Sequence, residues 1–359
     1  RQRQMCIRDR IGAANAQTRV FLNGAFCGLH LGGSTPFFCD ITPYIQPGEN
    51  LVMIEVDSTR RADAVPMHHT DWFNHGGLYR DVELVKVPAV HTSHLFVRLT
   101  DDGVAVDLTL SSDVDGTAEV DIAGLAKGKI EVRAGAGTTI LDCAPELWSP
   151  DSLRLYDVSV TYGSDRVTDR VGFRRIERRG RELLLNGRTL QLRGIGMHEE
   201  DLDLGKCSDE IEIRRRFAHL KDLGANVARA AHYPHHELVA RVADELGILL
   251  WEEIPVYWAV AFDNPPTFEN ARNQLVELIR RDANRASVIL WGVGNENADT
   301  DTRLDFMRGL VEAARAEDPS RLVTAACLIN RETFRIEDRL ADYLDVIGLN
   351  QYFGWYEPG

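Results

Sequence analysis

The stretch SVILWGVGNEN, residues Ser287 to Asn297, places a carboxylate where it can do chemistry. The apolar run at its start has the composition of a buried strand, and two glycines then lead into Asn295, Glu296 and Asn297. A carboxyl group at the end of a buried strand can serve as a general acid or base when it faces a pocket. The plain alternative is a carboxylate that pairs with an arginine and only stabilises the fold.

Other apolar runs after Gly180 also end in polar or aromatic residues: His198 and Glu199, His232 and Tyr233, Glu252 and Glu253, and Asn350 and Tyr352. Amphipathic helical patterns separate these runs, for example residues 208–224 with Ser208 as the expected N-cap. Regular alternation of strand and helix predicts a parallel sheet with helical crossovers. We count six strands, and in an α/β barrel the carboxyl ends of the strands form the catalytic face. No G-x-G-x-x-G follows the first strand, which disfavours a dinucleotide-binding fold.

The chain before residue 180 has the pattern of β structure. Short alternating runs separated by Asn23-Gly24 and Pro47-Gly48 predict hairpins, because these turns need positive φ. The strands between residues 89 and 176 are spaced like one immunoglobulin-like β-sandwich. We therefore expect three domains, at residues 12–88, 89–176 and 177–359.

Composition limits the classes of function. The net charge of -14 disfavours nucleic acid as a partner, and no apolar run is long enough to cross a membrane. The six cysteines show no C-x-x-C spacing, so neither a disulfide framework nor a zinc site is expected. His198, Glu199 and Glu200 also lack the helical spacing of a zinc motif. No metal and no cofactor is predicted.

The first ten residues, RQRQMCIRDR, are rich in arginine and lack apolar periodicity. They resemble a translated sequencing adapter more than a signal peptide, and we exclude them from the fold. We expect the true N-terminus to be missing. The sequence then does not decide the cellular compartment, and the cytoplasm is the default expectation.

Several stretches in the right order resemble glycoside hydrolase family 2, the family of β-galactosidases, β-glucuronidases and β-mannosidases. The stretches are LNGRTLQLRGIGMHEED, NVARAAHYPH, WEEIPVYW, NRASVILWGVGNEN and DVIGLNQYFGWY. Upstream, DWFNHGGLYRDVELV resembles the end of the family's sugar-binding jelly-roll domain, and VGFRRIE the exit from its immunoglobulin-like domain. The resemblance implies a partial β jelly-roll, an immunoglobulin-like β-sandwich and a (β/α)8 TIM barrel that stops after about six strands.

The resemblance also implies roles for individual residues. Glu296 would be the general acid/base of a retaining exo-β-glycosidase, and Asn295 would hydrogen-bond the sugar 2-hydroxyl. Asp71, in a jelly-roll loop that reaches into the barrel, would bind a sugar hydroxyl, as in the β-glucuronidase branch. The remaining residues expected to bind substrate at the barrel mouth are His198, His232, Asn350, Tyr352, Trp355 and Tyr356.

A retaining glycosidase needs a second carboxylate as nucleophile, which in this family ends strand seven. We expect it beyond Gly359, so that residues 1–359 alone would be inactive. A β-glucuronidase-like enzyme is the leading interpretation, with a β-galactosidase as runner-up. A non-catalytic carbohydrate-binding protein and a metal-dependent hydrolase are the alternatives from other classes. A β-glycoside would be the substrate, and the full-length enzyme would be a homo-oligomer.

Overall fold

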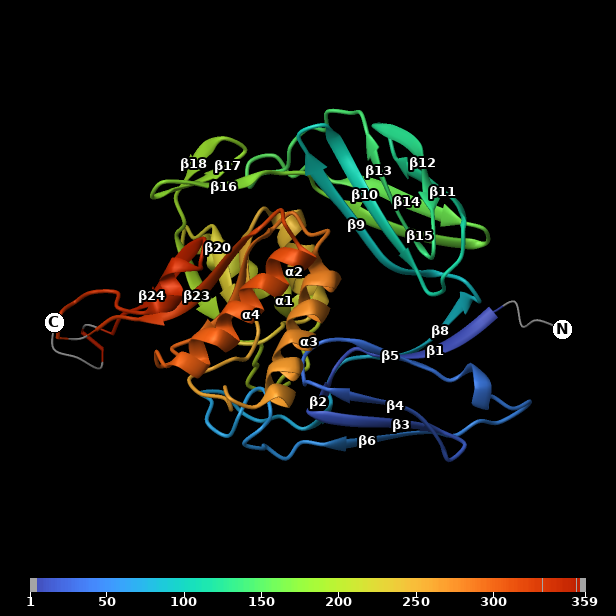
Figure 1. Cartoon of the computed structure of the whole chain (residues 1–359), viewed down its shortest axis with the longest axis horizontal. Coiled ribbons are helices and arrows are strands. Elements are labelled where there is room, and N and C mark those ends of the chain that lie inside the picture. Colours follow the sequence, from blue (N-terminus) through green and yellow to red (C-terminus); the bar gives the residue numbers. More distant parts are fainter. Residues whose placement is uncertain (1–4, 331, 353, 356–359) are drawn as a thin grey trace.

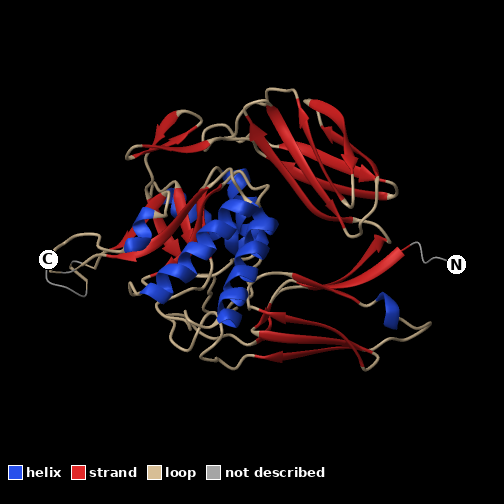
Figure 2. Ribbon diagram, in the orientation of Figure 1, coloured by secondary structure: helices blue, strands red, loops and turns tan. Residues whose placement is uncertain are grey.

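The computed structural model describes residues 5–330, 332–352 and 354–355, which form two β-sheet regions and a region of alternating strands and helices (Figures 1 and 2). In Figure 1 the two β-sheet regions lie beside the helical region, one above the other at the right. The chain crosses from each region to the next only once. The curled parallel sheet of the third region is what positions the candidate site.

The N-terminal region consists of two antiparallel three-stranded sheets and a short two-stranded ladder. The sheet orders are β5-β1-β8 and β4-β3-β6, with β2 paired to β7. Its elements are β1 Met5–Ile11, β2 Ala14–Asn15, β3 Gln17–Leu22, β4 Ala25–Leu31, β5 Phe37–Asp40, η1 Thr42–Tyr44, β6 Val52–Asp57, β7 Gly77–Leu78 and β8 Val82–Pro88. Apolar side chains from both sheets, among them Ile11, Val20 and Phe37, are buried between them. The predicted Asn23-Gly24 turn joins β3 to β4, and both residues have positive φ.

The exclusion of the first ten residues is wrong for those that form β1. This strand pairs with β8 over seven residues and with β5 over four. Its alternation is hidden in the sequence because polar side chains occupy one face. Asp9 is nevertheless buried, and burial raises the pKa of its carboxyl.

The second region is a sandwich of two antiparallel sheets, with orders β13-β10-β9 and β12-β11-β14-β15. Its strands are β9 Thr92–Thr100, β10 Gly103–Leu110, β11 Gly116–Ile122, β12 Ala126–Val132, β13 Ala136–Leu141, β14 Tyr156–Tyr162 and β15 Asp165–Val171. Alternate residues such as Val106, Val120 and Val160 fill the core between the sheets. A small antiparallel sheet follows, made of β16 Ile176–Arg179, β17 Glu182–Leu185 and β18 Arg188–Leu190. The exact domain boundaries stay a prediction.

The third region is a six-stranded parallel sheet in chain order, β19 to β24, which confirms the predicted strand count among the described residues. The strands are β19 Gly194–Met197, β20 Val227–Ala230, β21 Leu249–Glu253, β22 Val288–Asn295, β23 Leu322–Leu328 and β24 Val346–Asn350. The helices are α1 Glu210–Asp222, α2 Glu237–Leu246, α3 Pro265–Asp282 and α4 Asp301–Glu317, with the short η2 Arg339–Asp342 before β24. Apolar side chains of these helices pack on the sheet in one large core. The result is a partly closed TIM-type barrel.

Two details of this region differ from or add to the sequence-based expectation. The N-cap of α1 is Asp209 and not Ser208, because the Asp209 carboxylate accepts the backbone N–H of Glu212 at 2.9 Å. None of the described helices is long and apolar enough to cross a membrane.

Buried ion pairs and hydrogen bonds attach the N-terminal region to the barrel. Arg80 Nη2 lies 2.7 Å from Glu199 Oε2, and both side chains are almost fully buried. Glu277 of α3 accepts a hydrogen bond from Thr35 and lies 3.1 Å from His30. Other hydrogen bonds hold the loop between β6 and β7, which carries Asp71, against the barrel. Thr267 and Gln274 of α3 donate to the carbonyls of Asp63 and Val65 at 2.8 Å, and the Tyr257 hydroxyl donates to Asp71.

Candidate active site

Glu296 lies at the carboxyl end of β22, whose eight residues are all buried. Its backbone leaves the strand conformation with φ of +53°, and its N–H donates to the carbonyl of Ala326 at 2.8 Å. A positive φ is uncommon for a residue with a side chain and is found where surrounding structure enforces it. The turn brings the partly exposed carboxyl to the mouth of the barrel.

Three donors from two segments, the loop after β21 and the end of β24, reach the Glu296 carboxyl. The indole N–H of Trp258 donates to Oε2 at 2.9 Å, the amide of Asn350 donates to Oε1 at 2.8 Å, and the Tyr352 hydroxyl also donates to Oε1. Burial and the bond to this carboxyl raise the pKa of Tyr352 to about 12, so its hydroxyl stays a donor. The carboxyl is therefore held in one orientation.

Asn295 is fixed by side chains of β20 and β24, which lie two strands away from β22 on either side. Its Oδ1 accepts from Arg229 at 2.7 Å and from Asn350 at 3.2 Å. These bonds decide which way the amide points. Within the described residues, the Asn295 NH2 group has no acceptor, so it is available to a ligand oxygen.

Glu253, at the end of β21, is 1% exposed and holds Arg229 and His232 in place. The Arg229 guanidinium donates to both carboxylate oxygens at 3.0 Å, and His232 Nδ1 lies 2.6 Å from Oε1. Burial opposes ionisation of Glu253, but Arg229 and His232 outweigh it and hold its pKa below the ordinary value. Glu253 thus orients Arg229, which in turn orients Asn295.

Glu252 points the other way, as alternation along a strand requires. It is 1% exposed, and burial together with the nearby Asp282 raises its pKa well above the ordinary value. Glu252 therefore lies away from the mouth, in surroundings that favour its neutral form.

Trp72, from the N-terminal region, forms an aromatic wall at the mouth. Its ring centroid lies 5.0 to 6.0 Å from those of four other rings: His198, His232, Tyr233 and Tyr257. Burial, with His232 and Lys206 nearby, lowers the pKa of His198 to about 4, so this imidazole is neutral near pH 7. The preceding residue, Asp71, accepts the Tyr257 hydroxyl at 2.5 Å.

The structure gathers most of the predicted site residues at this mouth. Direct contacts connect Asn295, Asn350 and Tyr352 to Glu296 or to one another. Chains of two or more contacts bring in three more predicted residues, His198, His232 and, through Tyr257, Asp71. Trp355 is 78% exposed, and its backbone N–H donates to the Tyr352 carbonyl. Tyr356 lies outside the described residues. The roles of all these residues stay predictions.

Sequence reasoning missed Trp72, Tyr257, Trp258 and Asn297 as members of the site. The stretch WEEIPVYW contained the available signal, because it places two aromatic residues just after a strand end. Which neighbour they touch depends on how the loop lies against β22. The described residues contain no group of three or more His, Cys, Asp or Glu side chains that could hold a metal ion.

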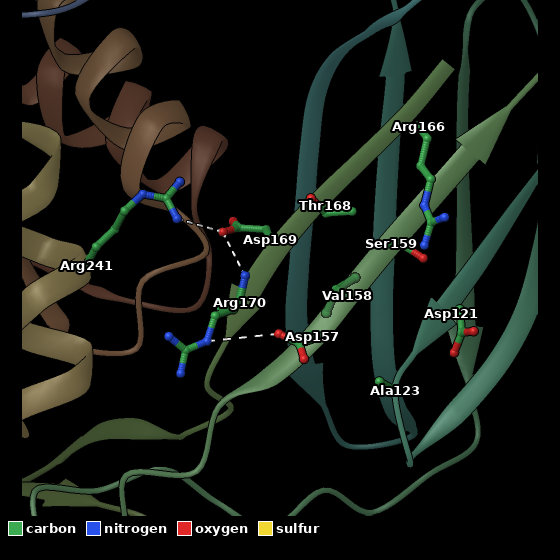
Figure 3. A pocket seen from close by; sticks show the side chains of 10 residues that line it. All are labelled: Asp121, Ala123, Asp157, Val158, Ser159, Arg166, Thr168, Asp169, Arg170 and Arg241. Carbon is green, nitrogen blue, oxygen red and sulfur yellow. Dashed lines mark hydrogen bonds and ion pairs between the residues drawn. The ribbon is translucent and has the colours of Figure 1, made fainter. Parts of the chain in front are cut away.

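A separate hollow of about 500 Å³ lies between the sandwich and α2 (Figure 3). Two of its acids are paired, Asp169 with Arg241 at 3.0 Å and Asp157 with Arg170 at 4.0 Å. Figure 3 shows the Arg241–Asp169 pair bridging helix and sheet. No predicted site residue lines this hollow, and its Arg241–Asp169 pair joins the sandwich to α2.

Comparison with known families assigns the chain. Residues 176–359 match the profile described as the TIM barrel domain of glycosyl hydrolases family 2, and residues 2–88 match the sugar binding domain of the same family. The curled parallel sheet and the carboxylate at the end of one of its strands agree with this match, because TIM barrels carry their active sites at the carboxyl ends of the strands. The chain belongs to glycoside hydrolase family 2.

Individual relatives agree with this assignment. The chain is 30% identical to a beta-glucuronidase of Paenibacillus borealis, over 97% of this chain and 65% of that protein. It is 31% identical to a beta-galactosidase of Thermoanaerobacter pseudethanolicus, over 89% of this chain and 46% of that protein. The chain thus spans about half to two thirds of these relatives.

Solved structures give the same fold. The beta-glucuronidase of Ruminococcus gnavus superposes with a TM-score of 0.87 at 26% identity, covering 99% of this chain and 66% of that one. The beta-glucuronidase of Bifidobacterium dentium, solved with coumarin-3-O-glucuronide, gives 0.90 at 26% identity, covering 98% and 67%.

Proposed function

We propose that the protein is a retaining exo-β-glycosidase in which Glu296 is the general acid/base. The observation that carries this proposal is the setting of Glu296: a carboxyl at the end of β22, oriented by Trp258, Asn350 and Tyr352. Cleavage of a glycosidic bond requires a proton on the departing oxygen, and a fixed carboxyl at the barrel mouth can deliver it.

In this mechanism the neighbouring residues bind the sugar. The free NH2 group of Asn295 donates to the 2-hydroxyl, a bond that strengthens as the oxocarbenium-like transition state forms. Asp71 accepts a hydroxyl from the other side of the ring, while Trp72 and His232 close the mouth against water. After the leaving group departs, Glu296 is a carboxylate and takes a proton from the water that completes hydrolysis.

The nucleophile is proposed to come from a segment outside the described residues. The other carboxylates near the mouth have different partners: Glu253 binds Arg229 and His232, Glu199 binds Arg80, and Asp71 binds Tyr257. Glu253 and Glu199 are committed to buried ion pairs, and Asp71 is the proposed acceptor of a sugar hydroxyl, so none of the three is assigned as the nucleophile. We therefore expect no turnover from residues 5–359 alone.

A β-glucuronide is the preferred substrate in this proposal, and a β-galactoside is the alternative. The support is the glucuronidase-like loop around Asp71 and the prevalence of beta-glucuronidases among the relatives, one of them solved with a coumarin glucuronide. The relative named beta-galactosidase keeps the alternative open. We also propose that the full-length enzyme is a homo-oligomer, which light scattering can measure.

The test compares residues 5–359 with a polypeptide that continues through a seventh and an eighth barrel strand. Both are assayed with 4-nitrophenyl β-glucuronide and β-galactoside. The longer protein should hydrolyse the glucuronide with the higher kcat/KM, and the shorter one should hydrolyse neither. Equal turnover by the two would place the nucleophile among the carboxylates described above and would overturn the proposed arrangement.

A further inference from the structure

Trp258 lies on a loop that is fixed along the end of β22. The backbone N–H of Asn295 donates to Val256 O at 3.0 Å, and that of Trp258 donates to Asn295 O at 2.9 Å. The Asn297 amide, in a side chain that is 2% exposed, donates to the carbonyls of Val256 and Trp258 at 3.2 and 3.0 Å. This third member of the Asn-Glu-Asn cluster therefore holds the loop.

The loop fixes the position of the Trp258 side chain through two contacts. Its indole N–H meets Glu296 Oε2 at 2.9 Å, and its ring packs on Tyr257 with centroids 4.6 Å apart. The residue has φ of +53° and remains 38% exposed. The N–H edge of the indole therefore binds the Glu296 carboxyl, while part of the ring stays exposed at the mouth of the barrel.

The two oxygens of Glu296 are not equivalent. Oε1 accepts from Asn350 and Tyr352, whereas Oε2 accepts only from Trp258 within the described residues. Two donors favour negative charge on Oε1, which leaves the acidic proton on Oε2. An indole N–H can only donate, so Trp258 cannot take that proton.

We propose that Trp258 is the positioning residue for the proton-donating oxygen of Glu296 and, with its exposed ring, the platform for flat aromatic leaving groups. This inference rests on the proposed glycosidase function. The proton passes directly from Glu296 Oε2 to the departing glycosidic oxygen, so these two atoms must lie close together. A side chain next to Oε2, such as Trp258, therefore also lies next to the leaving group. An exposed aromatic ring there offers a stacking surface to an aryl aglycone.

The proposed proton transfer and bond cleavage account for every proton and electron pair. The proton moves from Glu296 Oε2 to the glycosidic oxygen, and the C–O bond breaks with its electron pair going to that oxygen. The second carboxylate gives an electron pair to the anomeric carbon, and a neutral alcohol leaves. Oε2 gains negative charge in this step, and the Trp258 N–H then donates to a charged oxygen, which makes a stronger bond than to a neutral acid.

The experiment uses two variants of the full-length protein. Trp258→Phe keeps a ring and removes the N–H. Because that donor stabilises the ionised carboxyl, its loss should move the basic limb of the kcat/KM profile up by about one pH unit. It should slow alkyl β-glycosides by roughly 5- to 10-fold, with less effect on activated aryl glycosides.

Trp258→Leu removes both the donor and the ring. It should show the same shift in the pH profile and, in addition, raise KM for 4-methylumbelliferyl glycosides roughly 10-fold relative to methyl glycosides. The matched control is Phe26→Leu, which removes an exposed ring, 53% accessible, on the N-terminal region. This control should leave both readouts unchanged.

The outcomes separate the inference from the function on which it rests. Full-length protein without activity on any β-glycoside would reject both. An active protein whose Trp258→Phe variant keeps the wild-type pH limb would reject the positioning role. Equal KM changes for aryl and methyl glycosides in the Trp258→Leu variant would reject the role of Trp258 as a platform for aromatic leaving groups.

Discussion

Replacing Arg229 by methionine tests whether the buried network behind Asn295 holds the site together. Glu253 is 1% exposed and accepts both of its arginine hydrogen bonds at 3.0 Å, and only His232 remains as a partner when Arg229 is lost. Removing one partner of a buried ion pair leaves an uncompensated charge and costs about 3–5 kcal/mol. Methionine retains the contact of an unbranched side chain with Trp251, over which the guanidinium lies at 4.3 Å.

The assay is urea unfolding of the barrel at pH 7. Arg229→Met should lower the free energy of unfolding by about 3–5 kcal/mol, and the double variant Arg229→Met with Glu253→Gln should recover at least about 1 kcal/mol, because no charge is then buried unpaired. The surface pair Arg272–Glu269, at 3.3 Å with both side chains about half exposed, is the control. Arg272→Met should cost less than about 1 kcal/mol.

The cost of Arg229→Met should also depend on pH. Without the guanidinium, burial raises the pKa of Glu253 above its unfolded value, so the variant loses stability as pH rises through that pKa. The difference from wild type should therefore be larger at pH 8 than at pH 5. A loss below about 1 kcal/mol, or a double variant no more stable than Arg229→Met, would refute the reasoning.

In the full-length protein, Glu296→Gln should reduce kcat/KM by roughly 10²- to 10⁴-fold, least for aryl glycosides with good leaving groups, because kcat/KM reports the acid-assisted first step. Glu312→Gln on the exposed face of α4 should have no effect, and an equal loss of kcat/KM for every leaving group would argue against an acid role. Asp71→Asn should lower kcat/KM roughly 10- to 100-fold, because it removes a charged acceptor of a sugar hydroxyl, and unchanged kinetics would remove Asp71 from the site. Arg321 and other donors hold the pKa of buried Asp318 at about 2, against burial that raises it, so its contribution of about 2 kcal/mol is present above pH 4 and is lost as pH falls toward 2. Denaturant titrations of Asp318→Asn and wild type should accordingly differ at pH 7 and converge near pH 2, and a difference that persists at pH 2 would contradict this assignment.

Local pattern was enough to predict a parallel sheet of six strands with helical crossovers, whereas the barrel was implied by the resemblance to the family. The strand count and the polar residues at the carboxyl ends follow from periodicity, since parallel strands with helical crossovers present the same edge. The gathering of Asn295, Glu296, Asn350 and Tyr352 is a consequence of that topology.

Contacts that depend on the register of a loop could not be predicted. Trp258 reaches Glu296 because backbone hydrogen bonds and the Asn297 amide hold its loop beside β22, and no spacing in the sequence encodes that pairing. The role of Glu253, as opposed to Glu252, likewise depends on which strand face turns inward. The N-cap at Asp209 instead of Ser208 is a shift of one residue, and either side chain can cap a helix.

The strand formed by Met5–Ile11 was missed for a different reason. Its two neighbours, β5 and β8, lie roughly 30 and 75 residues further along the chain, and only their pairing gives the arginine-rich stretch a place in a sheet. Isolated, it has no periodicity that separates it from an irregular segment.

The most direct test of the central claim is chemical rescue of Glu296→Ala in the full-length protein. With an activated aryl β-glucuronide, the variant should still form the glycosyl-enzyme, because this leaving group needs little protonation, but the next step should stall without a general base. Azide needs no base, so added azide should restore turnover and yield the β-glycosyl azide, identified by NMR. Failure of azide to restore turnover, or an α-glycosyl azide as product, would contradict the assignment of Glu296 as the acid/base of a retaining β-glycosidase.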